Sequence, residues 1–561
     1  MKFDELLFSH LGEMGKYQRL QFLLVCLPTI FTAMHALSWT FAAISIPHRC
    51  ALEGEKKYSD FATLSPLISS FCKREDGSAA ELSAINETGV SCKVHECMLK
   101  DGGACSLGWV YDRSAVQQSA IGRWDIVCDR ASIKALVQAF YYAGQMAGSM
   151  TFGVLGDKIG RKKVFMMAIG LQLACGLLMA VAPTWWLYAL FRAGTGFSHP
   201  GIFVIAVVIG MELVGPSYRK LASVITGGFF SLGQVILGTA AYFFTDYAIL
   251  HVVITSPAFF FLLYWWFVPE SPRWLVSQKR YAEADVVLQK AARMNGVTLP
   301  ENWWTLLDQE DASESKEKKV DEANEGKEIL AASSKNESAV RSYSFLDLFR
   351  TPQLRKRTLT VFFLWPVISM VYYGLSMKSD VFGGNLYVNF IAGGFIEMPA
   401  LFLVFLIVDR VGRRILLAGG LATSGLCLLS NLFLPDDAPK VVAVAQLLVT
   451  KGAITAVYAT IYTFSPELFP TVVRNTAMGC CSTIARVGAI TASFVAMWIV
   501  ERMGRAFMII PFGALSLIAA FLTVTMLPET MGRPLPESIE QIEEGEAQGT
   551  EMQTLSATND E

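Results

Sequence analysis

Apolar stretches of about 20 residues, separated by short polar segments, follow one another along most of the chain. A helix needs this length to cross a bilayer, and the apolar residues do not alternate with polar ones as in a half-buried strand. The pattern predicts twelve spans, at 20–46, 134–154, 163–183, 187–209, 221–243, 248–268, 357–377, 386–408, 414–434, 440–463, 478–500 and 505–527. We therefore predict an all-α, multi-pass membrane protein. A content of 53% hydrophobic residues and a mean hydropathy of +0.41 agree with this class.

Charged motifs of the first half of the chain recur in the second half, in the same order and at offsets of 252 to 259 positions. Such a repeat indicates two six-helix halves with a substrate path between them. The paired positions are Asp157 with Asp409, Gly160 with Gly412, Arg161 with Arg413, Glu212 with Glu467, Arg219 with Arg474, and Glu270 with Glu529.

The spans and the polar segments between them define the expected domains. Basic residues recur in alternate loops, which places both termini and the central segment in the cytosol by the positive-inside rule. We expect a cytoplasmic N-terminus at 1–19, an N-terminal half at 20–268 with an extracellular loop at 47–133, a central cytoplasmic loop at 269–356, a C-terminal half at 357–527 and a cytoplasmic acidic tail at 528–561. No cleavable signal peptide is expected, because the first span is too long to be a signal core.

The long loop after the first span carries six of the eleven cysteines. An even number in a polar loop predicts an extracellular disulfide framework, for which fifteen pairings are open. Asn86 lies in a glycosylation sequon in the same loop and supports the same side. Oligomer formation through this loop is a further candidate property. The six cysteines are Cys50, Cys72, Cys92, Cys97, Cys105 and Cys128.

The duplicated charges suit a gate at the cytoplasmic ends of the two halves. In a transporter whose halves rock, contacts there must hold in one state and break in the other, and glycines beside the charges allow close backbone approach. The alternative is that these residues only set topology and solubility. The candidate gating set is Asp157, Arg161, Glu212, Arg219, Glu270, Arg273, Asp409, Arg413, Glu467 and Arg474.

Three charged residues inside the predicted spans are candidates for the substrate path. Lys451 and Arg486 flank the polar turn of SPELFPTVVRN, and Glu397 lies beside Pro399 in the eighth span. A charge near the bilayer centre costs at least about 2.5 kcal/mol, so each is expected to face a partner or the substrate path. Arg486 and Lys451 could hold a carboxylate, and Glu397 could hold a cationic group. The alternative is an ion network that never touches substrate.

Aromatic residues in these spans offer ring faces for quaternary ammonium groups. Most membrane aromatics are packing or interface residues, and Tyr372 and Tyr373 beside Gly374 are the strongest exceptions. The candidate substrate-binding set is Arg486, Glu397, Lys451, Tyr372, Tyr373, Trp365 and Gln234.

Sequence signals of an enzyme are absent. The six histidines show no metal-ligand spacing, no Walker A sequence occurs, and a net charge of −2 gives no indication of nucleic-acid binding. We therefore predict no metal and no cofactor, with Na⁺ as a candidate coupling ion only. The expected partners are the lipid bilayer and a small organic ion.

The motifs GDKIGRKK, RAGTGF, MELVGPSYR, FVPESPRWL, VDRVGRR, PELFPTVVRN and PETMGRPLPE, with the Cys-rich loop ending in GRWDIVCDR, cover nearly the whole chain. Together they resemble the organic ion transporter family of the major facilitator superfamily. LGEMGKYQRLQFLL and STIARVGAI resemble most the carnitine and novel organic cation transporter branch. The resemblance implies a major facilitator fold and transport by alternating access.

The resemblance also bears on the substrate. The family's cation carriers usually have Asp at the position of Arg486, whereas its anion carriers and carnitine-type members have Arg. Glu397 matches a carboxylate that cation and carnitine-type members keep. The carnitine branch typically has Ser where this chain has Ala485. We therefore expect a plasma-membrane carrier of organic cations and zwitterions, with an organic anion exchanger and a non-transporting sensor as alternatives.

Overall fold

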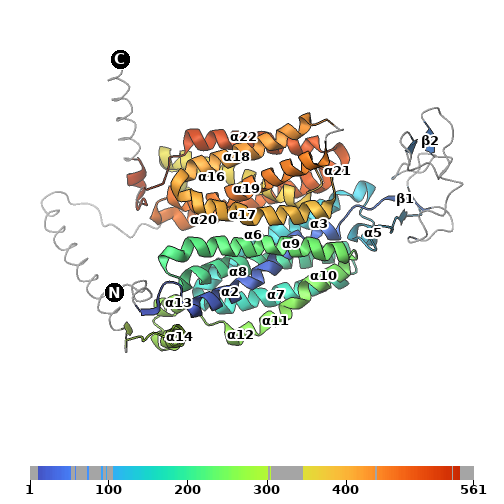
Figure 1. The fold of residues 1–561 in the computed structure, drawn as a ribbon. Coiled ribbons are helices and arrows are strands. Elements are labelled where there is room, and N and C mark those ends of the chain that lie inside the picture. The colour runs from blue at the N-terminus through green and yellow to red at the C-terminus, as the bar shows by residue number, and fades with distance from the viewer. Residues whose placement is uncertain are drawn as a thin grey trace, which may run out of the picture.

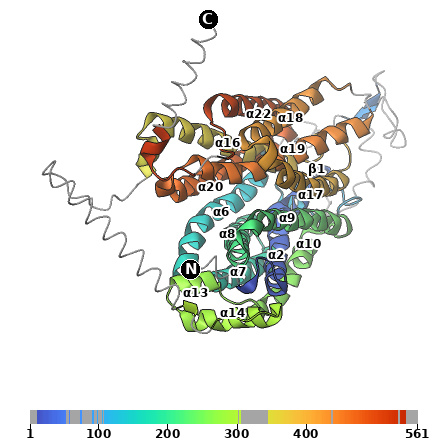
Figure 2. The same cartoon turned by 60° about the vertical axis from the view of Figure 1, so that its left-hand side comes forward.

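The computed structural model describes residues 10–51, 57, 72–74, 90–92, 97, 105, 107–300, 303–304, 345–435, 439–532 and 535–543. Two helical halves lie side by side, the first drawn from blue to green and the second in yellow to red (Figure 1). In the view turned by 60° they remain two separate layers of helices (Figure 2). A helical segment overlaps each of the twelve predicted spans.

The N-terminal half contains the six expected spans, two of which are divided. Its helices are α2 (Lys16–Leu37), α3 (Trp39–Ala42), α6 (Ser132–Ile159), α7 (Arg161–Val181), α8 (Trp185–Leu213), α9 (Arg219–Phe243), α10 (Tyr247–Thr255), α11 (Phe259–Leu262) and α12 (Tyr264–Phe267). Asp246 begins α10, because its side chain accepts hydrogen bonds from the N–H groups of Ala248 and Ile249.

The C-terminal half repeats this arrangement. Its helices are α16 (Pro352–Met377), α17 (Leu386–Val411), α18 (Arg413–Ser430), α19 (Lys440–Leu468), α20 (Thr471–Phe494), the π-helical turn η8 (Val495–Ile499), α21 (Val500–Met503) and α22 (Ala506–Met526). Asn385 caps α17 through hydrogen bonds from the N–H groups of Tyr387 and Val388. The expected Pro470 turn separates α19 from α20.

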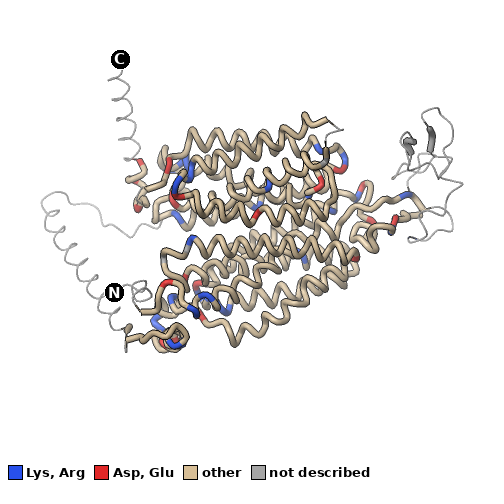
Figure 3. Tube along the Cα trace, in the orientation of Figure 1, with Lys and Arg blue, Asp and Glu red and all other residues tan. Residues whose placement is uncertain are grey.

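Within the described residues, eleven helical segments are long and apolar enough to cross a membrane. The one predicted span that is missing from this group is formed by α6. This helix is long enough to cross a membrane but carries Lys134, Gln138 and Gln145. All three side chains are buried. Because α6 packs between α8 of its own half and α20 of the other, protein rather than lipid surrounds its polar face. Charged residues gather at the two ends of the bundle and are sparse along its middle (Figure 3).

The halves meet along two helix pairs. In the N-terminal half α8 packs against α6 and α7, and α2 packs against α8 and α9. In the C-terminal half α18 packs against α19 and α22, and α16 packs against α20. Between the halves, α9 packs against α17 and α6 against α20. A side chain on the inner faces of these four helices therefore reaches the plane between the halves.

The segment between α3 and α6 lies at the end of the bundle opposite to α13 (Pro272–Ser277) and α14 (Tyr281–Asn295) (Figure 1). It contains β1 (His48–Cys50) paired antiparallel with β4 (Trp109–Tyr111), β2 (Cys72–Arg74) paired antiparallel with β3 (Val90–Cys92), α5 (Ala120–Trp124) and the 3₁₀ turn η3 (Cys128–Arg130).

Disulfides link distant parts of this segment. Cys50 bonds to Cys105, and Cys97 bonds to Cys128. These two bonds occur together in only one of the fifteen pairings left open by the sequence. Cys72 and Cys92 are register partners in the β2–β3 hairpin, and their side chains lie outside the described part of the chain, as does Asn86.

The central loop begins with ordered structure. Helix α14 is amphipathic, and buried Ala284, Leu288, Ala291 and Ala292 form one of its faces. Its partners in a small apolar cluster include Tyr17 of α2 and Trp274 of α13. Asn295 ties the end of α14 to α2, because its side chain accepts from Tyr17 N–H at 2.9 Å. The loop residues 305–344 lie outside the described residues.

Candidate transport site

A buried ion pair lies where α17 meets α19. Lys451 Nζ of α19 is 2.8 Å from Glu397 Oε1 of α17, and the two side chains are only 4% and 2% exposed. Lys451 also donates a hydrogen bond to the hydroxyl of Ser376, at the end of α16. Its ammonium lies 3.8 Å from the ring centroid of Tyr372. The two charges expected at membrane depth therefore neutralise each other.

The second carboxylate oxygen of Glu397 connects the two halves. Oε2 accepts hydrogen bonds from Ser231 Oγ at 2.9 Å and from Gln234 Nε2 at 2.7 Å, both on α9. The Tyr372 hydroxyl donates to the same oxygen at 3.2 Å. Gln234 Nε2 also donates to that hydroxyl at 3.1 Å. Glu397 thus belongs to a polar network that the N-terminal half completes, and such networks are strong only when every member is satisfied.

Arg486 of α20 is a further buried cation of this region and lacks a carboxylate partner among the described residues. It is 6% exposed, and no acidic side chain of the described residues forms an ion pair with it. Tyr462 lies within hydrogen-bonding reach of the guanidinium, which also interacts electrostatically with Tyr373 and Tyr458. Its Nε and Nη1 are buried without a hydrogen-bond partner. A buried N–H group without an acceptor lowers the stability of the fold. Its presence here indicates a place for an acceptor supplied from outside the protein.

Aromatic side chains form a continuous cluster beside Arg486. The rings of Tyr372 and Tyr458 lie 5.2 Å apart, and Trp365 contacts Tyr462 edge to face at 4.7 Å. Tyr373 lies 5.0 Å from Tyr142 of α6, which extends the cluster into the N-terminal half. Trp365 is held by a 3.0 Å hydrogen bond from its indole N–H to Ser465. We call this set, Tyr142, Trp365, Tyr372, Tyr373, Tyr458 and Tyr462, the aromatic cluster.

A small cavity adjoins the ion pair. Its lining includes Gln234, Ser376, Ser379, Asn389, Phe390 and Lys451. It has room for about one water molecule. Side chains of the protein therefore leave little free space beside the ion pair in this conformation.

The structure brings all seven predicted substrate-binding residues to this region between the halves. Trp39 lies in the N-terminal half, where its indole donates to the Lys134 carbonyl at 2.8 Å. Sequence reasoning missed Ser231 and Ser376. Helical spacing could have found them, because Ser231 precedes Gln234 by three residues and Ser376 follows Tyr372 by four.

The duplicated charges form the same structure in each half. In the first, Arg161 lies 3.0 Å from Asp157 and 3.3 Å from Glu212. Glu270 accepts from the N–H groups of Lys162 and Ser271, each at 3.0 Å. Arg161 thus contacts Glu212, another residue of the candidate gating set.

In the second half, Arg413 lies 2.9 Å from Asp409 and 3.3 Å from Glu467. Glu529 accepts from the N–H groups of Arg413 and Arg414, each at 3.0 Å. The sequence repeat is therefore a repeat of side-chain contacts. One difference is that Glu467 Oε2 receives the Thr530 hydroxyl, whereas Glu212 Oε2 is buried without a hydrogen-bond partner.

The ion pairs and hydrogen bonds described in the two preceding paragraphs join residues of the same half. Contacts of these particular groups with the opposite half therefore stay a prediction, for another conformation of the protein. At this end of the bundle, Lys220 of α9 lies 2.7 Å from Asp409 of α17 and joins the halves. Arg474 donates to the carbonyls of Phe469 and Pro536. Arg273 lies at the start of α13 and is not without interaction partners. The side chain of Arg219 lies outside the described part of the chain.

A second bridge between the halves lies at the opposite end of the bundle. Lys134 Nζ of α6 is 2.6 Å from Glu501 of α21, which also accepts from Ser45 at 2.9 Å. Arg502 donates to the Cys128 carbonyl at 3.2 Å, so the disulfide-linked segment contacts the C-terminal half. An ion pair therefore links the two halves at each end of the bundle.

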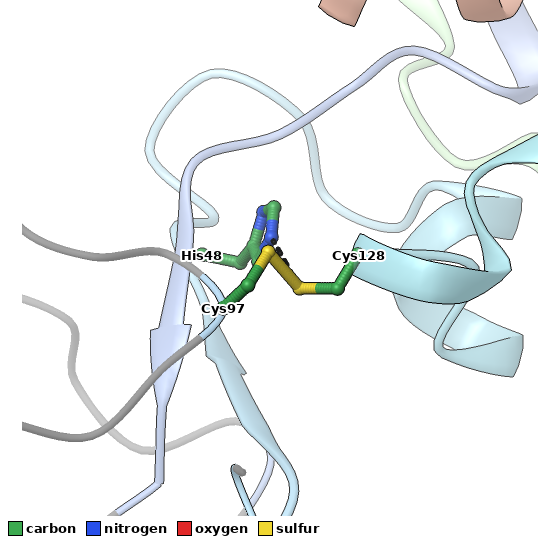
Figure 4. A group of neighbouring side chains, drawn as sticks. All are labelled: His48, Cys97 and Cys128. Atoms are coloured by element: carbon green, nitrogen blue, oxygen red, sulfur yellow. Dashed lines mark hydrogen bonds between the residues drawn. A yellow bond between two sulfur atoms is a disulfide. The ribbon is translucent and has the colours of Figure 1, made fainter. Parts of the chain in front are cut away.

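Near this bridge, His48, Cys97 and Cys128 form a compact group of the kind that can hold a metal (Figure 4). Cys97 and Cys128 are bonded to each other, however, and His48 Nε2 lies 4.0 Å from Cys128 Sγ. A sulfur in a disulfide is not a thiolate ligand, so in this state the group is a structural cross-link.

Known proteins resemble this chain over nearly its whole length. Residues 127–542 match the family model described as sugar (and other) transporter. The organic cation transporter protein of Drosophila melanogaster is 39% identical over 542 residues, covering 96% of this chain and 94% of that protein. Solute carrier family 22 member 6-B of Xenopus laevis is 32% identical, covering 98% and 96%, and solute carrier family 22 member 4 of Mus musculus is 30% identical, covering 96% and 94%.

Among solved structures, the inward open conformation of the xylose transporter XylE from E. coli matches with a TM-score of 0.58 at 15% identity, covering 92% of this chain and 98% of that chain. At this identity the likeness establishes the fold, which confirms the expected major facilitator architecture of two six-helix halves. Relatives and structural neighbours are transporters, as the lack of enzyme motifs predicted. The chain therefore belongs to the sugar (and other) transporter family and, within it, to the organic ion transporters that include solute carrier family 22.

Proposed function

We propose that this protein is a plasma-membrane carrier of organic zwitterions, such as carnitine-like betaines, and that it works by alternating access between the two halves. In this proposal the α13–α14 end and both termini face the cytosol, and the disulfide-linked segment faces outside, where cysteines oxidise. The carnitine-type branch indicated by STIARVGAI agrees with this substrate class.

The single observation that carries the proposal is the state of Arg486. Its guanidinium is buried between the halves with Nε and Nη1 unpartnered. A guanidinium presents a planar fork that matches a carboxylate in a bidentate geometry. A substrate carboxylate would therefore supply both the missing charge and the missing acceptors.

The aromatic cluster supports a role for the other end of a zwitterion. A quaternary ammonium group has no N–H to donate, so it is recognised by ring faces and by charge. Rings from α16, α19 and α6 surround the approach to Arg486 and belong to both halves. A ligand bound here would contact both halves, as a substrate that drives their rocking must.

Uptake measurements in cells that express the protein test this proposal. Labelled carnitine, tetraethylammonium and an aryl carboxylate are compared, each with and without Na⁺. We expect carnitine to accumulate above the level in cells without the protein, and tetraethylammonium to accumulate less. Accumulation of tetraethylammonium alone would overturn the proposal. Dependence on Na⁺ would assign it as the coupling ion, whereas uptake unchanged without Na⁺ would exclude Na⁺ from that role.

An organic anion is the second candidate substrate, and one observation favours it. Lys451, Arg486 and Glu397 together leave one positive charge at the centre. A simple anion would neutralise that charge without an ammonium group. Accumulation of the aryl carboxylate but not carnitine would select this alternative.

A further inference from the structure

We propose that His48, Cys97 and Cys128 form a zinc site in the disulfide-linked segment once the bond between the two cysteines is reduced. The ligands are two thiolates and one imidazole nitrogen, a donor set that suits Zn²⁺. The three ligand atoms already lie within 4.8 Å of one another (Figure 4). Cys97 and His48 are 31 and 80 positions away from Cys128, so no short sequence motif marks the group.

The imidazole of His48 is oriented as a metal ligand. Its Nδ1 lies 3.2 Å from the carbonyl oxygen of Ile46, and because a carbonyl only accepts, Nδ1 carries the ring proton. The lone pair is then at Nε2, which lies 4.0 Å from Cys128 Sγ and faces the disulfide (Figure 4). A histidine that binds zinc through one nitrogen commonly donates its other N–H to a backbone carbonyl in this way.

Strand β1 and its neighbour β4 hold this ring in place. His48 and Tyr111 are register partners of the two strands, and their ring centroids lie 5.9 Å apart. The Tyr111 hydroxyl in turn donates a hydrogen bond to Asp125 at 2.9 Å. None of these contacts involves a cysteine, so the position of the imidazole does not depend on the disulfide.

Cys128 is also anchored by contacts other than its disulfide. Its carbonyl accepts from Arg502 of the C-terminal half and from the N–H group of Ala131, each at 3.2 Å. Its φ value of +55° is uncommon for a residue with a Cβ, and the surrounding fold has to maintain it. When the disulfide opens, Cys128 therefore stays beside His48, and Cys97 is the ligand that moves.

Reduction of the disulfide uses a low-molecular-weight thiol supplied from outside the protein. The thiolate of this reductant attacks one sulfur, the S–S bond breaks, and the other sulfur leaves as a thiolate. A second reductant thiol resolves the mixed disulfide. Two reductant thiols are thus oxidised to one disulfide, and the protein gains two thiols. Zn²⁺ then binds both sulfurs and the imidazole, and the two thiol protons are released.

The spacing of the ligand atoms fits zinc after a small movement. Zn–S and Zn–N bonds of about 2.3 and 2.0 Å place neighbouring ligand atoms of a tetrahedral site about 3.5–3.8 Å apart. The 4.0 Å between His48 Nε2 and Cys128 Sγ is close to this range. Water takes the fourth position. Bound zinc joins the same two cysteines as the disulfide does, so it restores the cross-link in the reduced protein.

Zinc binding by the full-length protein tests the proposal. Protein purified in detergent is reduced with dithiothreitol, freed of reductant without air, and titrated with Zn²⁺ in competition with a chromophoric chelator. Protein that has not been reduced is the control. We expect the reduced wild type to bind one more Zn²⁺ ion than the control. Equal binding by the two samples would overturn the proposal.

His48→Gln distinguishes this site from zinc binding by thiols alone. The variant retains all cysteines, and after reduction we expect it to bind Zn²⁺ at least tenfold more weakly than wild type. Unchanged affinity would show that His48 is not a ligand. The matched control removes the other disulfide of the segment, in the double variant Cys50→Ser with Cys105→Ser. It should keep the affinity of wild type, and loss of binding there would assign zinc to that pair instead.

Melting temperatures of the same samples report the restored cross-link. Reduction should lower the melting temperature of wild type, and Zn²⁺ should then raise it, because a ligand that binds only the folded state stabilises that state. In reduced His48→Gln the same zinc concentration should give a smaller rise. An equal rise in both proteins would contradict the role of His48. None of these outcomes depends on which substrate the carrier transports, so the proposed function is tested separately.

Discussion

At the scale of single residues, the three charges in the spans divide into a satisfied pair and an unsatisfied cation. Their presence could be predicted, because a charged residue within an apolar segment is recognised from the sequence alone. Whether Glu397 meets Lys451 or a substrate cation stays open in the sequence, because the choice depends on how closely α17 approaches α19. Packing shows that Glu397 has a counter-charge and that Arg486 has none among the described residues.

Removing the charge of Arg486 should affect carboxylate substrates selectively. We expect Arg486→Gln to lower the apparent affinity for carnitine by about 10- to 100-fold, since a charge-assisted hydrogen bond contributes roughly 1.5–3 kcal/mol. Concentration-dependent uptake measures this. Arg486→Lys, which keeps a point charge without the fork, should lose less. Equal loss for carnitine and for a substrate without a carboxylate would contradict the assignment.

At the scale of elements, the repeated turns before α7 and α18 show how closely the two halves correspond. Gly160 and Gly412 have φ values of +104° and +94°, which residues with a Cβ rarely adopt. Each lies against a carboxylate, Glu270 or Glu529, that accepts hydrogen bonds from the start of the next helix. The repeated sequence motifs predicted this correspondence. The individual hydrogen bonds between the carboxylate oxygens and the N–H groups depend on the turn geometry, so the sequence does not predict them.

Substituting Gly412 should therefore destabilise the C-terminal half. An added Cβ would lie 2.6 Å from Glu529 Oε2 in an unfavourable backbone conformation. We expect Gly412→Ala to cost about 1–3 kcal/mol, measured as a lower melting temperature of the detergent-purified protein. Gly419→Ala is the matched control within α18, because no atom lies within 4 Å of its added Cβ. It should leave stability unchanged or raise it slightly.

At the scale of the whole molecule, the ion pairs Lys220–Asp409 and Lys134–Glu501 link the halves at opposite ends of the plane between them. The sequence predicted the two halves from the repeat, but neither bridge, because neither pair is duplicated. Lys134 is the first residue of the predicted span 134–154. In the fold it is a contact between halves, held 2.6 Å from Glu501.

Breaking one bridge should open the corresponding end. Lys134→Met should favour the state open toward the disulfide-linked segment, whereas Lys220→Met should favour the opposite state. We expect about a fivefold change in population for about 1 kcal/mol lost. The measurement is the labelling of Ser379→Cys on intact cells by a membrane-impermeant thiol reagent, since Ser379 lines the central cavity. Faster labelling in both variants, or in neither, would contradict this assignment of the two bridges.

The filled centre of the protein also bears on what crosses the membrane when no substrate is present. Both ends are bridged, and the space beside Lys451 has room for about one water molecule. A cavity of this size does not hold a continuous column of water along which small ions could leak. Cells that produce the carrier in quantity should therefore keep their resting electrical resistance, and the membrane potential remains available to drive transport.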